Sequence, residues 1–223
     1  VINISQYENC SEIKKLILAE TINIISSRAF YGCYGIEGTL TIPDSVTTIG
    51  DEAFYNCTGL TELKLSQSLV AIADHAFENC INISGNLNIP DLVTTIGRYA
   101  FSNCSGFNGT LNLSTKISQI SDYVFANCSK LRGNLVIGDS VKTIGDGSFM
   151  NCFGFNGTLK LNSSIKSLGK DCFYGCSGFN GLILNCSLSK IVDNVFNNCY
   201  GLKGAINFPN TIRLFGAKSF YNC

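Results

Sequence analysis

The chain has 223 residues, and its 16 basic residues balance its 16 acidic ones. This balance provides no basic surplus for a nucleic-acid backbone and no polybasic segment for an anionic membrane. Hydrophobic residues make up 45% of the chain, which excludes intrinsic disorder. No apolar run approaches the roughly 20 residues that a transmembrane helix needs, so we expect no membrane insertion by this segment and no nucleic-acid partner.

Phenylalanine recurs every 23 or 24 residues, from Phe30 to Phe220, and a cysteine follows each of these phenylalanines after three residues. A fixed period in this range indicates stacked structural repeats. Tyr7 and Cys10 stand at the same two positions in front of this series. We predict that the repeated residues form a buried structural ladder, whose central members are Phe54, Cys57, Phe77, Cys80, Phe101, Cys104, Phe125, Cys128, Phe149 and Cys152.

Each repeat starts with two aliphatic residues at a spacing of two, such as Leu40 and Ile42, which predicts a very short strand with both side chains facing inward. Turn-forming residues such as Pro43 follow. The rest of the repeat has an irregular apolar spacing, and we expect a short extended piece and then a helical or 3-10 turn around the phenylalanine. In chain order the predicted strands are 16–18, 40–42, 63–65, 87–89, 111–113, 135–137, 159–161, 182–184 and 206–208.

These repeats predict a solenoid of about nine coils over residues 1–223, which we treat as one domain and as a piece of a longer protein. One coil buries about seven apolar side chains, worth roughly 10–20 kcal/mol, whereas ordering its residues costs on the order of 35 kcal/mol. Coils must therefore stack to fold. Most coils have an extra residue in a glycine-containing stretch before the strand, and the coils of Leu16, Leu63 and Leu182 lack it.

The 12 cysteines are interpreted as reduced core thiols. Stacked strands lie about 4.8 Å apart with parallel side chains, whereas a disulfide needs converging Cβ atoms about 3.8 Å apart. Cys172 is also assigned to packing, and Cys186 is expected near solvent because other coils have aspartate there. We predict no metal site, because no CxxC pair accompanies the single histidine, His75.

The remaining polar residues offer no converging catalytic group. Asparagine precedes eight of the ten repeated cysteines, and Gly32 and Gly175 precede the other two. We interpret these asparagines as turn residues that tolerate unusual dihedral angles. Aspartates such as Asp74 and Asp122, three or four residues before the phenylalanine, are interpreted as caps of the short helical turn. We expect His75 to be solvated, and no nucleophile recurs beside it. The sequence therefore predicts no catalytic residue, no cofactor and no enzyme.

The outward side of the strands is the candidate partner-binding surface, because curved repeat proteins commonly bind partners there. Its residues vary between coils, which fits both a binding surface and a merely solvated face. The predicted surface consists of Thr41, Lys64, Asn88, Asn112, Val136, Lys160, Ile183 and Asn207.

Asn-x-Ser/Thr glycosylation acceptors are frequent, and the acceptors in predicted loops are Asn108, Asn156 and Asn162. Because many such motifs arise by chance in a chain rich in asparagine, serine and threonine, they are interpreted as modest support for a secreted or surface protein.

The unit LTIPDSVTTIGDEAFYNCTGLTELKL, residues 40–65, resembles the BspA-like, or Treponema pallidum-type, leucine-rich repeat. The strand and turn LxIP, the core IGxxAF and the following NC carry the resemblance, which covers essentially the whole chain. Phe215 in place of isoleucine and Tyr7 in place of phenylalanine depart from the pattern. The glycine-containing insertion and the composition look more like protist members, among which trichomonad surface antigens look closest.

The resemblance implies a right-handed leucine-rich-repeat solenoid with a parallel strand ladder. It also implies a non-enzymatic protein-interaction module, a cell-surface or extracellular adhesin or antigen that binds host matrix proteins or neighbouring cells. The alternative is an intracellular scaffold or a self-assembling filament or coat protein that uses open ends or edges. No family motif defines a ligand, so no binding residue can be transferred.

Overall fold

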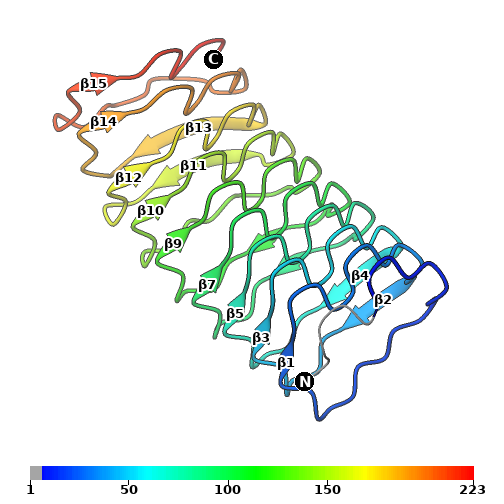
Figure 1. Cartoon of the computed structure of the whole chain (residues 1–223). Helices are drawn as coiled ribbons and strands as arrows, with labels where there is room; N and C mark the ends of the chain where they lie inside the picture. The colour runs from blue at the N-terminus through cyan, green and yellow to red at the C-terminus, as the bar shows by residue number, and fades with distance from the viewer. Residues whose placement is uncertain (1–6) are drawn as a thin grey trace.

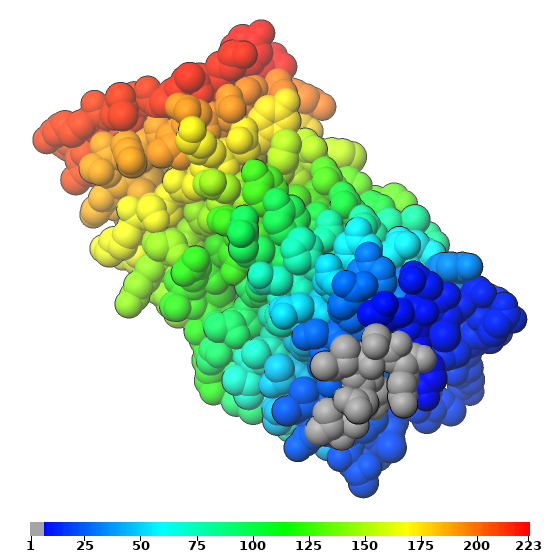
Figure 2. Space-filling view, in the orientation of Figure 1, coloured from blue at the N-terminus to red at the C-terminus, as the bar shows by residue number. Residues whose placement is uncertain are grey.

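The computed structural model describes residues 7–223, and residues 1–6 of the predicted solenoid lie outside them. The chain winds in parallel-stranded coils from one end of an elongated body to the other (Figure 1). Successive coils form adjacent bands on the surface (Figure 2). The described chain makes about eight turns, slightly fewer than the nine coils that the repeats predict. Within these residues no helix is present that could span a membrane.

One series of strands lies on the return side of the coils, in the segments where the sequence predicts a short extended piece. All pair in parallel with the strand of the neighbouring coil, in the orders β1-β3-β5-β7, β9-β10-β12 and β14-β15. These strands are β1 (Ile24–Ile25), β3 (Thr48–Ile49), β5 (Ala71–Ile72), β7 (Thr95–Ile96), β9 (Gln119–Ile120), β10 (Thr143–Ile144), β12 (Ser167–Leu168), β14 (Lys190–Ile191) and β15 (Leu214–Phe215).

A second series lies where the sequence predicts strands, but it forms isolated pairs and no continuous ladder. Residues 16–18, 135–137 and 206–208 are not strands, so the predicted strand assignment is wrong there. The second series consists of β2 (Gly38–Thr41) with β4 (Leu60–Lys64), β6 (Leu87–Asn88) with β8 (Leu111–Asn112), and β11 (Gly157–Leu161) with β13 (Phe179–Leu184).

Coil length explains the two longest pairs. β4 and β13 belong to coils that lack the extra residue, and each pairs with the longer coil before it. The register shifts beside Gly38 and Gly157, both at φ 81°, where the shorter coil has one unpaired residue, Thr61 in β4 and Asn180 in β13. Glycine adopts positive φ without a Cβ penalty, so the longer coil can turn into its strand at these two positions.

The segment around each phenylalanine is a series of turns, so the predicted helical or 3-10 turn is wrong for residues 7–223. Positive φ two residues before and two residues after the phenylalanine prevents helix formation, as at Glu52 (53°) and Asn56 (58°). The freed backbone groups bond between coils. The N–H of Phe54 donates to the carbonyl of Ala76 at 2.8 Å, whereas that of Cys57 donates locally to the carbonyl of Phe54 at 3.3 Å.

The core contains the two predicted columns of repeated side chains. Phenylalanine rings stack from Phe30 to Phe220 with centroids 5.0–5.9 Å apart. Beside them, the repeated cysteines from Cys57 to Cys223 donate their thiols to the phenylalanine carbonyl of the preceding coil. Cys57, for example, lies 3.1 Å from the carbonyl oxygen of Phe30. These bonds satisfy polar atoms inside an apolar core, where an unpaired group would be costly.

Cys186 is buried, with 3% of its surface exposed, and the expectation of a solvent-facing thiol is wrong. Burial alternates through 182–188, so that Cys186 shares the inward side with Leu184 and Leu188. The alternation of buried and exposed side chains continues past the end of β13. The aspartates at the equivalent position of other coils lie outside such an alternation. Cys172 is buried as well.

The aspartates cap backbone groups, but across coils and not within a helical turn. Asp74 Oδ1 accepts from the N–H of Arg98 at 2.7 Å, and Asp122 Oδ1 accepts from the N–H of Asp146 at 2.9 Å. Because the turns contain no helix, a local cap has nothing to bind. The carboxylates instead hold the start of each turn against the next coil.

Candidate binding surface

The predicted strand-face residues all have exposed side chains in the structure. The exposed apolar members are Val136, with 67% of its surface accessible, and Ile183, with 39%. Ile17, at the equivalent position of an earlier coil, is 77% exposed. The face therefore combines isolated apolar side chains with lysines and amides, a mixture that ordinary protein–protein interfaces also show.

Where two strands pair, the outward side chains of neighbouring coils also bond to each other. Asn112 Nδ2 donates to Asn88 Oδ1 at 2.6 Å. Thr39 Oγ1 donates to Glu62 at 2.6 Å, and Lys64 Nζ lies 3.5 Å from Glu62. These exposed contacts contribute little to stability, but they restrict the orientation of the side chains on the paired strands.

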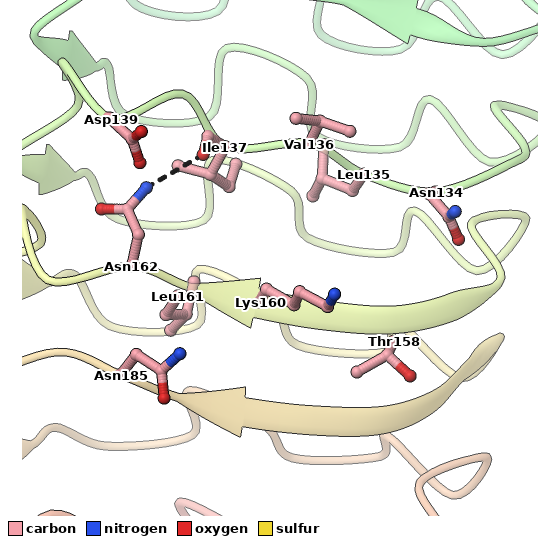
Figure 3. Close-up of a pocket in the computed structure, with 10 residues that line it drawn as sticks. All are labelled: Asn134, Leu135, Val136, Ile137, Asp139, Thr158, Lys160, Leu161, Asn162 and Asn185. Carbon is pink, nitrogen blue, oxygen red and sulfur yellow. Dashed lines mark hydrogen bonds between the residues drawn. The ribbon is translucent and has the colours of Figure 1, made fainter.

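Grooves open where strands of this face do not pair. One of these grooves, about 420 Å³, lies between residues 134–137 and β11 (Figure 3). Val136 and Lys160 lie on its two sides, and Asn162 Nδ2 closes one end by donating to the carbonyl of Ile137 at 3.0 Å. Smaller grooves of about 160 and 260 Å³ lie beside β13 and beside residues 15–18.

Val136 and Lys160 belong to the predicted surface, but the sequence pattern does not predict this groove. Asp139, Asn162 and Asn185, which also line it, are not part of the predicted surface. The one available signal is Gly138, which stands where other coils have Pro43 or Pro90. That glycine marks an altered turn, but sequence alone does not show that the neighbouring strands separate.

The buried thiols are chemically passive. Burial raises the pKa of Cys80 and of Cys128 to about 12 from 9.0. Burial also raises the pKa of Cys104 well above 9.0, and the neighbouring thiols Cys80 and Cys128 contribute to this rise. Because the thiolate is the reactive form, these side chains serve packing and hydrogen bonding.

His75 is half-buried, so the expectation of a solvated side chain is corrected. Its ring stacks on Tyr99 at a centroid distance of 4.9 Å, and Tyr99 stacks on Tyr123 at the same distance. His75 Nδ1 also bonds to the carboxylate of Glu78. The stacked rings cover one another's faces, so we interpret His75 as a structural residue of this ring stack.

The three loop acceptors differ in accessibility. Asn108 and Asn156 are exposed. The Asn162 side chain is partly buried, and its amide nitrogen donates to the carbonyls of Ile137 and Gly138 at 3.0 and 3.2 Å. Because a glycan would be attached to that nitrogen, Asn162 would have to give up both hydrogen bonds.

Comparison with known proteins identifies the repeat. The model of the BspA type leucine-rich repeat region matches residues 1–108 and 108–223, with six copies. This match spans the chain, and the chain belongs to the BspA-type leucine-rich-repeat family. The predicted leucine-rich-repeat solenoid is thereby confirmed. Comparison with curated proteins gave no match.

Several solved structures share this fold. A leucine-rich repeat protein from Bacteroides ovatus is 23% identical, with a TM-score of 0.62 over 99% of this chain and 67% of its own. The leucine-rich repeat protein of T. pallidum is 26% identical, with a TM-score of 0.58 over 82% and 72%. A protein from Faecalibacterium prausnitzii described as a leucine-rich cell surface protein is 22% identical, with a TM-score of 0.70.

The alignment with the F. prausnitzii protein covers 91% of this chain but only 62% of the F. prausnitzii chain. What these relatives do as whole proteins is therefore not transferred to this chain. The expected likeness to protist members stays a prediction.

Proposed function

We propose that the chain is a non-enzymatic protein-binding module of a cell-surface or secreted protein, and that it binds host matrix proteins or neighbouring-cell proteins through its outward strand face. The supporting observation is the contrast between two sets of positions. The inward residues repeat and form buried columns, whereas Lys64, Val136 and Lys160 differ from coil to coil and are exposed. Membership in a repeat family of interaction modules supports the same proposal.

The proposal requires that binding depends on this face and not on the net charge of the molecule. The double variant Lys64→Glu and Lys160→Glu changes two exposed strand-face lysines. A matched control, Lys142→Glu and Lys166→Glu, makes the same charge change at exposed lysines that precede β10 and β12 on the return side.

The measurement is adhesion of the purified protein to an epithelial monolayer and to immobilised matrix glycoproteins. We expect the strand-face variant to bind at least about tenfold more weakly, a loss of about 1.4 kcal/mol, while the control binds like the parent. Equal loss in both variants would reject the strand face as the binding surface. No binding by the parent, together with concentration-dependent growth in light scattering, would favour the alternative, a self-assembling scaffold.

Glycopeptide mass spectrometry on protein from its native source tests the surface location separately. Glycans on Asn108 or Asn156 would support passage through a secretory route. If both are unmodified, an intracellular scaffold becomes the better explanation.

A further inference from the structure

The groove between residues 134–137 and β11 exposes unpaired backbone as well as side chains. Among residues 7–223, no backbone hydrogen bond joins residues 134–137 to β11. At one end of the groove the two coils are joined by the bridge of Gly133 with Phe155 and by the N–H of Asn156, which donates to the carbonyl of Gly133 at 3.1 Å. At the other end they are joined by the side chain of Asn162. The separation therefore begins and ends within one short stretch of the two coils.

The paired coils show which way the free groups of β11 point. In other coils, carbonyls of outward residues accept from the preceding coil, as Lys64 does from the N–H of Ile42 at 2.8 Å. The inward Leu161 accepts from the following coil, from the N–H of Asn185 at 2.9 Å. In a parallel ladder the N–H of a residue points to the same side as its carbonyl. The N–H and C=O of Thr158 and Lys160 thus face the groove.

The opposite side of the groove supplies matching groups. Leu135 and Ile137 occupy the inward positions whose backbone groups face the following coil, as those of Ile42 do. The carbonyl of Ile137 bonds to Asn162, whereas the N–H groups of Leu135 and Ile137 have no backbone partner among residues 7–223. Free donors and acceptors on a strand edge are a template for another extended chain.

We propose that this groove takes an extended segment of a partner polypeptide, which adds as a strand to the edge of β11. This inference rests on the proposed function, because it requires that the strand face binds protein. Strand addition derives affinity from main-chain hydrogen bonds and selectivity from alternate side chains. The backbone of Thr158 and Lys160 supplies the first, and the side chains that line the groove supply the second.

The lining side chains specify the chemistry of the segment. Val136 presents an exposed apolar side chain on one side (Figure 3). Lys160 lies on the other side and forms no ion pair with any described residue. An acidic residue therefore complements Lys160, and an apolar residue at an alternate position complements Val136.

Proline at position 160 separates backbone recognition from side-chain recognition. Lys160→Pro removes the N–H that faces the groove but no bond to β13, and proline is tolerated on edge strands whose N–H faces outward. Lys160→Ala is the matched control, because it removes the charge and retains the N–H. We expect both variants to keep the circular dichroism and cooperative unfolding of the parent.

The probe is a phage-displayed library of random short peptides, selected on the parent protein and counter-selected on Lys160→Pro. We expect peptides that contain an acidic residue near an apolar one and that lose about tenfold or more in affinity on Lys160→Pro, with a smaller loss on Lys160→Ala. Hydrogen exchange of the amides of Thr158 and Lys160 should be fast in the free protein and slow with bound peptide.

Peptides that bind Lys160→Pro as well as the parent, or a selection without enrichment, would overturn strand addition. If Lys160→Pro does not fold, unchanged exchange at Thr158 and Lys160 in the peptide-bound parent overturns it equally. If Lys64→Glu with Lys160→Glu loses cell adhesion but Lys160→Pro retains it, the proposed function stands and the strand-addition inference fails.

Discussion

Asparagine occupies the turn after most of the repeated phenylalanines and performs two tasks there. Asn127 has a φ of 60°, which asparagine tolerates better than most residues. Its side chain also continues an amide ladder, because Asn127 Nδ2 donates to Asn103 Oδ1 at 2.8 Å and Asn151 Nδ2 donates to Asn127 Oδ1 at 2.9 Å. Gly32 and Gly175 occupy this position in two other coils and keep only the backbone conformation.

Two variants at position 127 separate the contribution of the amide hydrogen bonds from that of the backbone conformation. Asn127→Gly loses the amide bonds but keeps the left-handed backbone, and we expect it to lower the free energy of unfolding by about 1 kcal/mol. Asn127→Ala also places a Cβ at positive φ and should lower it by about 2–3 kcal/mol. Urea denaturation measures both. If alanine were tolerated as well as glycine, the backbone conformation would not be the dominant requirement.

The buried thiols make stability sensitive to alkaline pH. At pH values below about 9 they are protonated in both the folded and the unfolded states. The pKa of Cys80 and of Cys128 in the folded protein is raised to about 12 from 9.0. Between these pH values the unfolded chain loses protons that the folded chain retains, so the stabilisation present below pH 9 is lost as pH rises toward 12.

We expect each buried thiol to lower the free energy of unfolding by up to about 1.4 kcal/mol per pH unit in that window. Denaturant titrations under reducing conditions at several alkaline pH values measure the slope for the parent and for Cys80→Ala with Cys128→Ala. The variant should show a shallower slope, since tyrosines and lysines titrate alike in both proteins. Parallel slopes would mean that the thiols do not cause the alkaline sensitivity.

At the scale of elements, the phenylalanine column connects the coils. Phe125 is fully buried and stacks on Phe101 at 5.9 Å and on Phe149 at 5.5 Å. Stacked aromatic rings add to the stabilisation that area burial alone gives. Because each coil buries its hydrophobic side only against neighbours, damage in one coil is shared with the coils on both sides.

Phe125→Ala should therefore lower the free energy of unfolding by about 3–5 kcal/mol. Phe153→Ala, at a side chain that is 53% exposed, is the matched control and should cost less than about 1 kcal/mol. Hydrogen exchange should show faster opening in the coils of Phe101 and Phe149 as well. Loss of protection confined to the coil of Phe125 would contradict coupling between coils.

At the scale of the whole molecule, the solenoid is a quasi-one-dimensional stack, so stability should vary along it. Central coils have neighbours on both sides, and their phenylalanines are almost fully buried. In the last described coil Leu214 is 57% exposed and Phe215 is 48% exposed. Fewer buried contacts permit local opening at lower free energy than global unfolding.

For a polypeptide of these 223 residues, we expect the amides of the central coils, Phe101 to Phe173, to be best protected from exchange. Protection should then decrease toward the coil of Phe220. Native-state hydrogen exchange by mass spectrometry, with peptide coverage of every coil, checks this. Uniform protection from coil to coil would show that the array unfolds as a single unit, and would contradict additive nearest-neighbour stability.

The sequence by itself determined the period, the inward positions and the family. Phenylalanine, cysteine and the aliphatic residues recur because every coil must bury the same side chains against its neighbours, and burial leaves a periodic record. The exposed positions of Thr41, Lys64 and Lys160 follow from the same alternation.

Only the tertiary structure decided how the coils connect. Asp74 and the amide of Asn127 bond to neighbouring coils, Cys186 turns inward, and the outward strands pair in twos, leaving a groove beside β11. These features depend on how one coil sits on the next, a relation between residues more than twenty positions apart. The repeat pattern predicts the side on which the recurring residues lie, but the fit between coils decides where Cys186 points and which hydrogen bonds form.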